Sequence, residues 1–109
     1  MNMEIIYQSE YETLAVDIAV IYNLLYNTPN YYKASNVELL VMLTDYNDGF
    51  GYRMISRACI KNPEEEIYDM AVDVQGQPLE ALHKMHSELL KLLGEELPEE
   101  IKKREFRYN

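Results

Sequence analysis

The segment from 51 to 75 constrains the fold most, because one antiparallel pairing gives it both an apolar face and a charge-matched face. Asn62-Pro63-Glu64 is typical of a tight turn, since proline presets the backbone angle that such a turn needs. A turn centred there places Arg57 opposite Asp69 and Arg53 opposite Asp73. The apolar positions alternate with these on both strands: Tyr52, Met54, Ala58 and Ile60, then Tyr68, Met70, Val72 and Val74. We therefore predict a β-hairpin of residues 51–61 and 65–75.

Apolar residues at helical spacing predict a helix on each side of this hairpin. The first helix is predicted over about 10–27, where Ser9 and Glu12 have the spacing of a capping box. The second is predicted over about 78–93, with Pro78 in its first turn and Gly94 as its C-terminal cap. The stripes that carry these predictions are Leu14, Ile18, Ile21 and Leu25, and Leu79, Leu82, Leu89 and Leu93.

Three other segments carry weaker patterns. Residues 3–7 are predicted as a short edge strand. Residues 36–46 are predicted as a helix, because Ser35 and Glu38 repeat the capping-box spacing, with a buried strand over 37–43 as the alternative. Residues 98–109 are predicted as a short basic helix or tail. Together these elements predict one α+β domain over 1–109, a small antiparallel sheet packed with two or three helices.

The charge of the chain bears on its partners. The formal net charge is −9, and residues 1–32 contain no Lys or Arg. So negative a protein repels nucleic-acid phosphates and anionic lipid, which favours a basic protein as the partner. No apolar run is long enough to span a bilayer, no secretory signal opens the chain, and Cys59 is the only cysteine. These features predict a cytoplasmic protein without disulfides.

Three patterns could carry chemistry. Glu80, His83 and His86 lie three residues apart, so a helix would place them together as in metal-binding bundles, but no second motif supplies the carboxylates that such sites need. Residues 45–49 have the composition of a calcium loop but not its spacing. Cys59 is predicted near Arg57, which would lower the pKa of a thiol, although a small apolar residue in a strand is the simpler interpretation. We expect no metal, no cofactor and no enzymatic activity.

Tyrosine is the unusual residue, with ten Tyr against two Phe and no Trp. Tyrosine is enriched in protein-binding surfaces, and several tyrosines lie in or just after the segment without positive charge. The alternative is that they are half-buried packing residues. The predicted partner-binding residues are Glu10, Glu12, Asp17, Tyr22, Tyr26, Tyr31 and Tyr32. A second apolar stripe on the first helix predicts a subunit interface of Val16, Val20 and Leu24.

The segment 31–40, the hairpin and the segment 74–82 together resemble the small phage ABA-sandwich domains, which run helix, strands and then a small-residue turn into a last helix. The resemblance covers about 60 residues, implies a phage or mobile-element source, and transfers no functional residue. The leading hypothesis is a non-enzymatic acidic protein that occupies a basic groove of a nucleic-acid-processing partner, as DNA mimics do. The alternative is a small homo-oligomeric, regulatory or antitoxin-like module.

Overall fold

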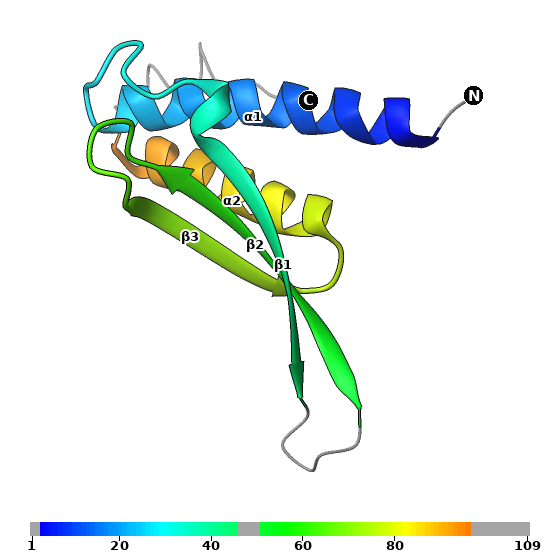
Figure 1. The fold of residues 1–109 in the computed structure, drawn as a ribbon. Coiled ribbons are helices and arrows are strands. Elements are labelled where there is room, and N and C mark those ends of the chain that lie inside the picture. Colours follow the sequence, from blue (N-terminus) through cyan, green and yellow to red (C-terminus); the bar gives the residue numbers. More distant parts are fainter. Residues whose placement is uncertain (1–2, 46–50, 97–109) are drawn as a thin grey trace.

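In the part of the chain that the structure describes, a three-stranded antiparallel sheet packs with two α-helices, in the chain order α1, η1, β1, β2, β3, α2 (Figure 1). The computed structural model describes residues 3–45 and 51–96, and the side chains of 8–44 and 51–95. The sheet order is β1-β2-β3, so each strand pairs with the next along the chain. The predicted α+β class is confirmed. The predicted tail over 98–109 lies outside the described residues.

The predicted helix over 36–46 is wrong, and the alternative of a strand is right. Residues Val37–Asp45 form β1, which pairs with β2 (Tyr52–Lys61) without interruption from Val37↔Ile60 to Asp45↔Tyr52. The preceding turn is a short 3-10 helix, η1 (Ala34–Asn36), in which Asn36 Oδ1 accepts a hydrogen bond from the Lys33 backbone N–H (2.8 Å). Pairing with β2 stabilises this segment as a strand more than the local capping pattern stabilises it as a helix.

The β2–β3 hairpin is confirmed, but its predicted register is wrong. β3 is Tyr68–Gln75, and Arg57 lies opposite Asp73 rather than Asp69. The connection is longer than a tight turn because Asn62 Oδ1 accepts the backbone N–H groups of Glu64 (2.9 Å) and Glu65 (3.1 Å), and Glu66 takes a left-handed φ of 55°. From Ile55 to Ile60 the partners differ from the predicted ones by four residues, an even number, so these side chains keep their predicted face. An irregularity in the pairing follows between Ile60 and Lys61.

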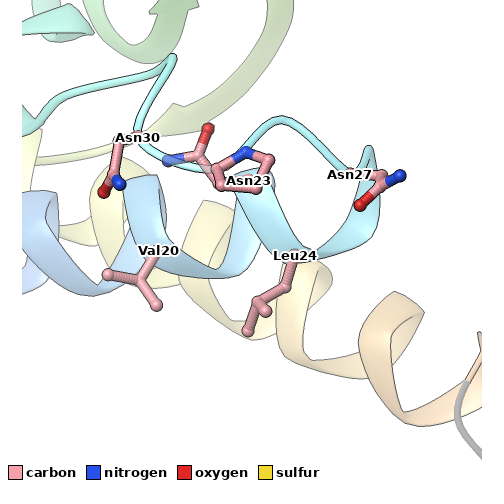
Figure 2. A pocket seen from close by; sticks show the side chains of 6 residues that line it. Val20, Asn23, Leu24, Asn27 and Asn30 are labelled. Atoms are coloured by element: carbon pink, nitrogen blue, oxygen red, sulfur yellow. The ribbon is translucent and has the colours of Figure 1, made fainter.

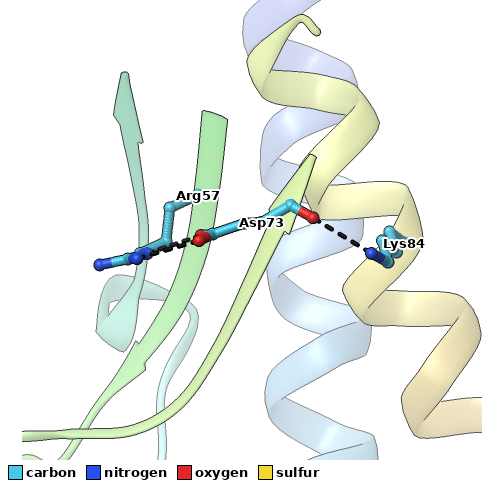
Figure 3. Close-up of polar contacts among 3 residues, drawn as sticks. All are labelled: Arg57, Asp73 and Lys84. Atoms are coloured by element: carbon cyan, nitrogen blue, oxygen red, sulfur yellow. Dashed lines mark hydrogen bonds and ion pairs between the residues drawn. The ribbon is translucent and has the colours of Figure 1, made fainter. Parts of the chain in front are cut away.

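An ion pair joins β2 to β3, and a hydrogen bond joins β3 to α2 at the same residue, Asp73 (Figure 3). Arg57 donates two hydrogen bonds to the Asp73 carboxylate, at 2.6 and 2.9 Å. These bonds hold the pKa of Asp73 below its usual value. Lys84 of α2 donates to the backbone carbonyl of the same residue at 3.1 Å. One charge pair of the predicted face thus exists, with Asp73 in place of Asp69 as the partner of Arg57. The predicted pairing of Arg53 with Asp73 is wrong, because Arg53 lies beyond the part of β2 that pairs with β3 and faces Thr44 of β1.

The helices α1 (Met3–Leu25) and α2 (Pro78–Glu96) run parallel to each other (Figure 1). α2 packs on β2 and β3, and α1 packs beside α2 and against η1 and β1. The predicted strand over 3–7 is wrong, since adding turns to an existing helix costs less than an unpaired strand. α2 continues past Gly94, which is therefore not its cap. In the turn before α2, Gly76 has a φ of 157°, and a Cβ there would overlap Glu80 Oε2.

The core lies between the two helices and one face of the sheet. Ile18 of α1, Leu82 and Met85 of α2, and Ala58 and Ile60 of β2 are at most 1% exposed. Neither described helix is long and apolar enough to cross a membrane. Strand β3 pairs with β2 only from Ile55 onward, so beyond that point β1 and β2 form a two-stranded extension. We call residues 43–45 and 52–54 the β1–β2 arm, and Figure 1 shows it projecting away from the helices.

Candidate protein-binding surface

The outer face of α1 carries a row of exposed apolar side chains. Val16, Val20 and Leu24 lie four residues apart on one helix, so they share one face of it. Their exposed fractions are 53%, 51% and 58%. The opposite side of the same helix contributes Leu14 and Ile18 to the core. The residues predicted as a subunit interface thus lie together on the surface of the part of the chain that the structure describes, as an exposed apolar patch of the kind that interfaces use.

A pocket of about 250 Å³ lies at the C-terminal end of this row (Figure 2). Val20 and Leu24 supply apolar surface, and the remainder comes from the end of α1 and the following loop. Asn27 and Asn30 adopt left-handed backbone conformations, with φ of 53° and 63°, which turn this loop. The full lining is Val20, Asn23, Leu24, Asn27, Pro29 and Asn30. An apolar pocket with amides at its rim suits one apolar side chain of a partner.

The predicted contact tyrosines divide into a buried pair and a more exposed pair. Tyr22 and Tyr32 are in the core, and their ring centroids lie 4.7 Å apart in an edge-on contact. Tyr32 donates a hydrogen bond to Asp69, and Asn23 Nδ2 donates to the Tyr32 carbonyl at 2.8 Å. Burial raises the pKa of Tyr22 to about 12, and burial followed by Asp69 raises the pKa of Tyr32. Little of either ring is left for a partner.

Tyr26 and Tyr31 remain partly accessible at this end of the molecule. Tyr26 is exposed, and Tyr31 is half-buried with its hydroxyl 3.4 Å from Asn62 Oδ1. Asn62 opens the β2–β3 turn, which contains Glu64, Glu65 and Glu66. Glu64 and Glu65 therefore come near the ring of Tyr31, although 31 residues separate Tyr31 from Asn62 in sequence. Partial burial and then Glu64 raise the pKa of Tyr31. Sequence reasoning missed these three glutamates as a site, because only the hairpin brings them beside the loop after α1.

Two of the three predicted contact carboxylates meet histidines of α2. Glu10 Oε1 lies 2.6 Å from His83 Nε2, and Asp17 Oδ2 lies 3.0 Å from His86 Nε2. Glu12 points to solvent and accepts a hydrogen bond from Gln8 Nε2 at 3.0 Å. Glu10 and Asp17 thus hold α1 to α2 as well as adding negative charge.

The same contacts bear on the predicted metal pattern. His83 and His86 have separate carboxylate partners, and Glu80 Oε2 accepts the Gln77 backbone N–H (2.7 Å) at the start of α2. Within 3–45 and 51–96, no three His, Cys, Asp or Glu residues are grouped to hold a metal ion. The calcium-like pattern falls mostly on residues outside this part of the chain. On α2, His83 and His86 therefore each pair with a different carboxylate of α1, instead of forming one set of metal ligands with Glu80.

Cys59 has no features of a reactive thiol. It is fully buried in β2, and this burial raises the pKa of the thiol despite the opposing effect of Arg57. Arg57 acts to lower that pKa, as expected, but the loss of hydration is the larger effect, so the net shift is upward.

No family model, curated protein or solved structure matches this chain. The resemblance to phage ABA-sandwich domains stays a prediction.

Proposed function

We propose that this protein is a non-enzymatic interaction protein that binds a basic protein partner through the outer face of α1. The observation that carries the proposal is the row of Val16, Val20 and Leu24, each more than half exposed, which leads to a pocket. In many interfaces a few side chains that are buried in well-packed pockets supply most of the binding energy. The proposed contact consists of the row of Val16, Val20 and Leu24, the pocket, and Tyr26.

The charge of the protein indicates what kind of partner it binds. The net charge of −9 and the exposed Glu12, Glu64, Glu65 and Glu66 attract a positive surface and repel phosphate. A protein that handles nucleic acid offers a basic groove of this kind. Occupying that groove would exclude the nucleic acid, so the proposed biological effect is inhibition by DNA mimicry.

The test is a pull-down from a lysate of the source cells. It compares immobilised wild-type protein with two variants, in each of which one leucine is replaced by aspartate. Leu24→Asp changes the proposed contact, and Leu92→Asp makes the same change on α2, at a residue that is 39% exposed. We expect one basic nucleic-acid-processing protein to bind the wild type and Leu92→Asp, to elute with salt, and to be lost with Leu24→Asp. Equal retention by all three proteins, or binding indifferent to salt, would refute the proposal.

The second candidate is a homo-oligomer that buries the same row between subunits. The spacing of Val16, Val20 and Leu24 along α1 suits helix-to-helix packing. Sedimentation of the purified protein separates the two candidates, since this oligomer forms without a partner and Leu24→Asp dissociates it.

A further inference from the structure

The outer edge of β1 lacks the features that normally protect an edge strand. Within the described residues, β1 pairs only with β2, so one side of its nine residues is without a neighbouring strand. Natural edges are commonly blocked by Pro, Lys, a bulge or a covering element. β1 contains no Pro, Gly, Lys or Arg, and its register with β2 has no irregularity. The first residue of β1 is covered, because Tyr11 Oη donates to the Val37 carbonyl at 2.6 Å.

The helix-facing side of β1 stays apolar beyond the point where the helices cover it. Val37 is in the core and Leu39 packs partly against it. The next two residues on the same face are Val41 and Leu43, which are 52% and 71% exposed. The arm thus continues the core face of the sheet into solvent (Figure 1).

We propose that β1 pairs with β1 of a second copy of this chain, antiparallel and centred on Val41. The strand is self-complementary in that register: Val41 faces its own symmetry mate, Leu39 faces Leu43, and Leu40 faces Met42. The sheet becomes six-stranded, in the order β3-β2-β1-β1-β2-β3. A two-fold axis normal to the sheet keeps the helices of both copies on one face, so the exposed side chains of each arm lie beside the partner's helical layer.

The charges on the other face of the strand fit the same register. Glu38 carries a buried oxygen, Oε2, that has no hydrogen-bond partner among the described residues. The pairing sets Glu38 opposite Thr44 of the second copy. In each chain Arg53 Nε lies 3.3 Å from Thr44 Oγ1, so a guanidinium comes next to that carboxylate twice in the dimer. This local attraction opposes the repulsion between two chains of net charge −9.

A cysteine cross-link tests the register. Facing residues of antiparallel strands have Cα atoms about 4.5–5.5 Å apart, which a disulfide can span. We expect Val41→Cys to give a covalent dimer on oxidation. Leu43→Cys, which is more exposed, should not cross-link, since its two copies lie about 14 Å apart in this register. Wild type is the background control, because its single Cys59 is buried. Equal cross-linking of both variants, or none with Val41→Cys, would overturn the register.

Analytical sedimentation of the protein without cross-links tests whether β1 or α1 forms the dimer interface. We expect wild type to dimerise at micromolar concentration, Leu43→Lys to weaken the dimer about tenfold or more, and Leu24→Lys to leave it unchanged. Circular dichroism establishes that each variant is folded. Glu38→Arg and Arg53→Glu should each weaken the dimer, and the double variant should restore it. A monomeric wild type would overturn the proposal without bearing on a basic partner at α1. A dimer lost with Leu24→Lys and kept with Leu43→Lys would also overturn it, and would favour a subunit interface on α1 instead.

Discussion

Tyr32 shows how a residue predicted at a surface can serve the core. Its ring lies against Tyr22 and Tyr31, and its hydroxyl bonds to Asp69, which also accepts from Asn62 Nδ2 at 3.1 Å. The loop after α1 is thereby joined to the start of β3. A tyrosine can fill apolar space and still reach a carboxylate, which Phe cannot do.

We expect Tyr32→Phe to lower the free energy of unfolding by about 1 kcal/mol, the usual contribution of one hydrogen bond. The ring contacts remain, so the change isolates the hydroxyl. Urea denaturation measures the effect. Tyr26→Phe is the matched control on an exposed ring and should change stability by less than about 0.5 kcal/mol. Equal effects for the two variants would show that the Asp69 bond adds nothing.

The raised tyrosine pKa values predict a loss of stability at alkaline pH. The pKa of Tyr22 rises from 10.0 to about 12 in the folded protein, so folding favours the neutral phenol. This contribution is fully present below pH 10 and is lost as pH rises from 10 towards 12. Urea denaturation across that range should show a steeper decline for wild type than for Tyr22→Phe. Parallel declines would contradict the buried assignment.

At the scale of the element, α2 is the helix on which both the sheet and α1 pack. Its buried residues lie on a broad face, whereas Leu92 points outward. Core positions and surface positions of α2 therefore lie within a few residues of each other in the sequence.

Leu82→Ala and Leu92→Ala make the same change in these two environments. We expect a loss of about 2–5 kcal/mol for Leu82, which is fully buried, because a cavity replaces the lost side chain. Leu92→Ala should cost less than about 1 kcal/mol. Chemical denaturation of both variants checks this. Similar costs would mean that α2 is rotated about its axis relative to the structure.

The sequence predicts some of these elements well and others poorly, for physical reasons. The two helices and the hairpin follow from local periodicity, which depends only on near neighbours. The register of the hairpin does not, because the side chain of Asn62 and the left-handed Glu66 lengthen its turn. β1 depends on a partner strand, so its local capping pattern is misleading.

The candidate surface was predictable only where it lies on a single helix. Val16, Val20 and Leu24 are recognisable from their spacing alone. The contact of Glu10 with His83 spans 73 positions, and no pattern in one sequence indicates it. The same holds for the glutamates of the β2–β3 turn, which reach the loop after α1 only through the folded hairpin.

For the whole molecule, the excess of negative charge should make stability depend on salt. The ion pairs among the described residues are few: Arg57 with Asp73, and two contacts that involve histidine. Screening therefore removes more repulsion than attraction. We expect the thermal midpoint to rise with NaCl, as followed by circular dichroism.

A variant with Glu64→Gln, Glu65→Gln and Glu66→Gln together provides the control for this salt effect. It carries less negative charge, so its thermal midpoint should rise less with NaCl. A midpoint that falls with salt in the wild type would mean that the attractive pairs dominate.

The parallel pairing of α1 with α2 has a consequence for synthesis on the ribosome. The apolar side of α1 that enters the core is translated first, and α2, which covers it, is translated about 70 residues later. Until then Leu14, Ile18 and Ile21 have no α2 to pack against. The nascent chain therefore exposes the apolar side of this helix for most of its translation. A chaperone that recognises short apolar segments would bind there.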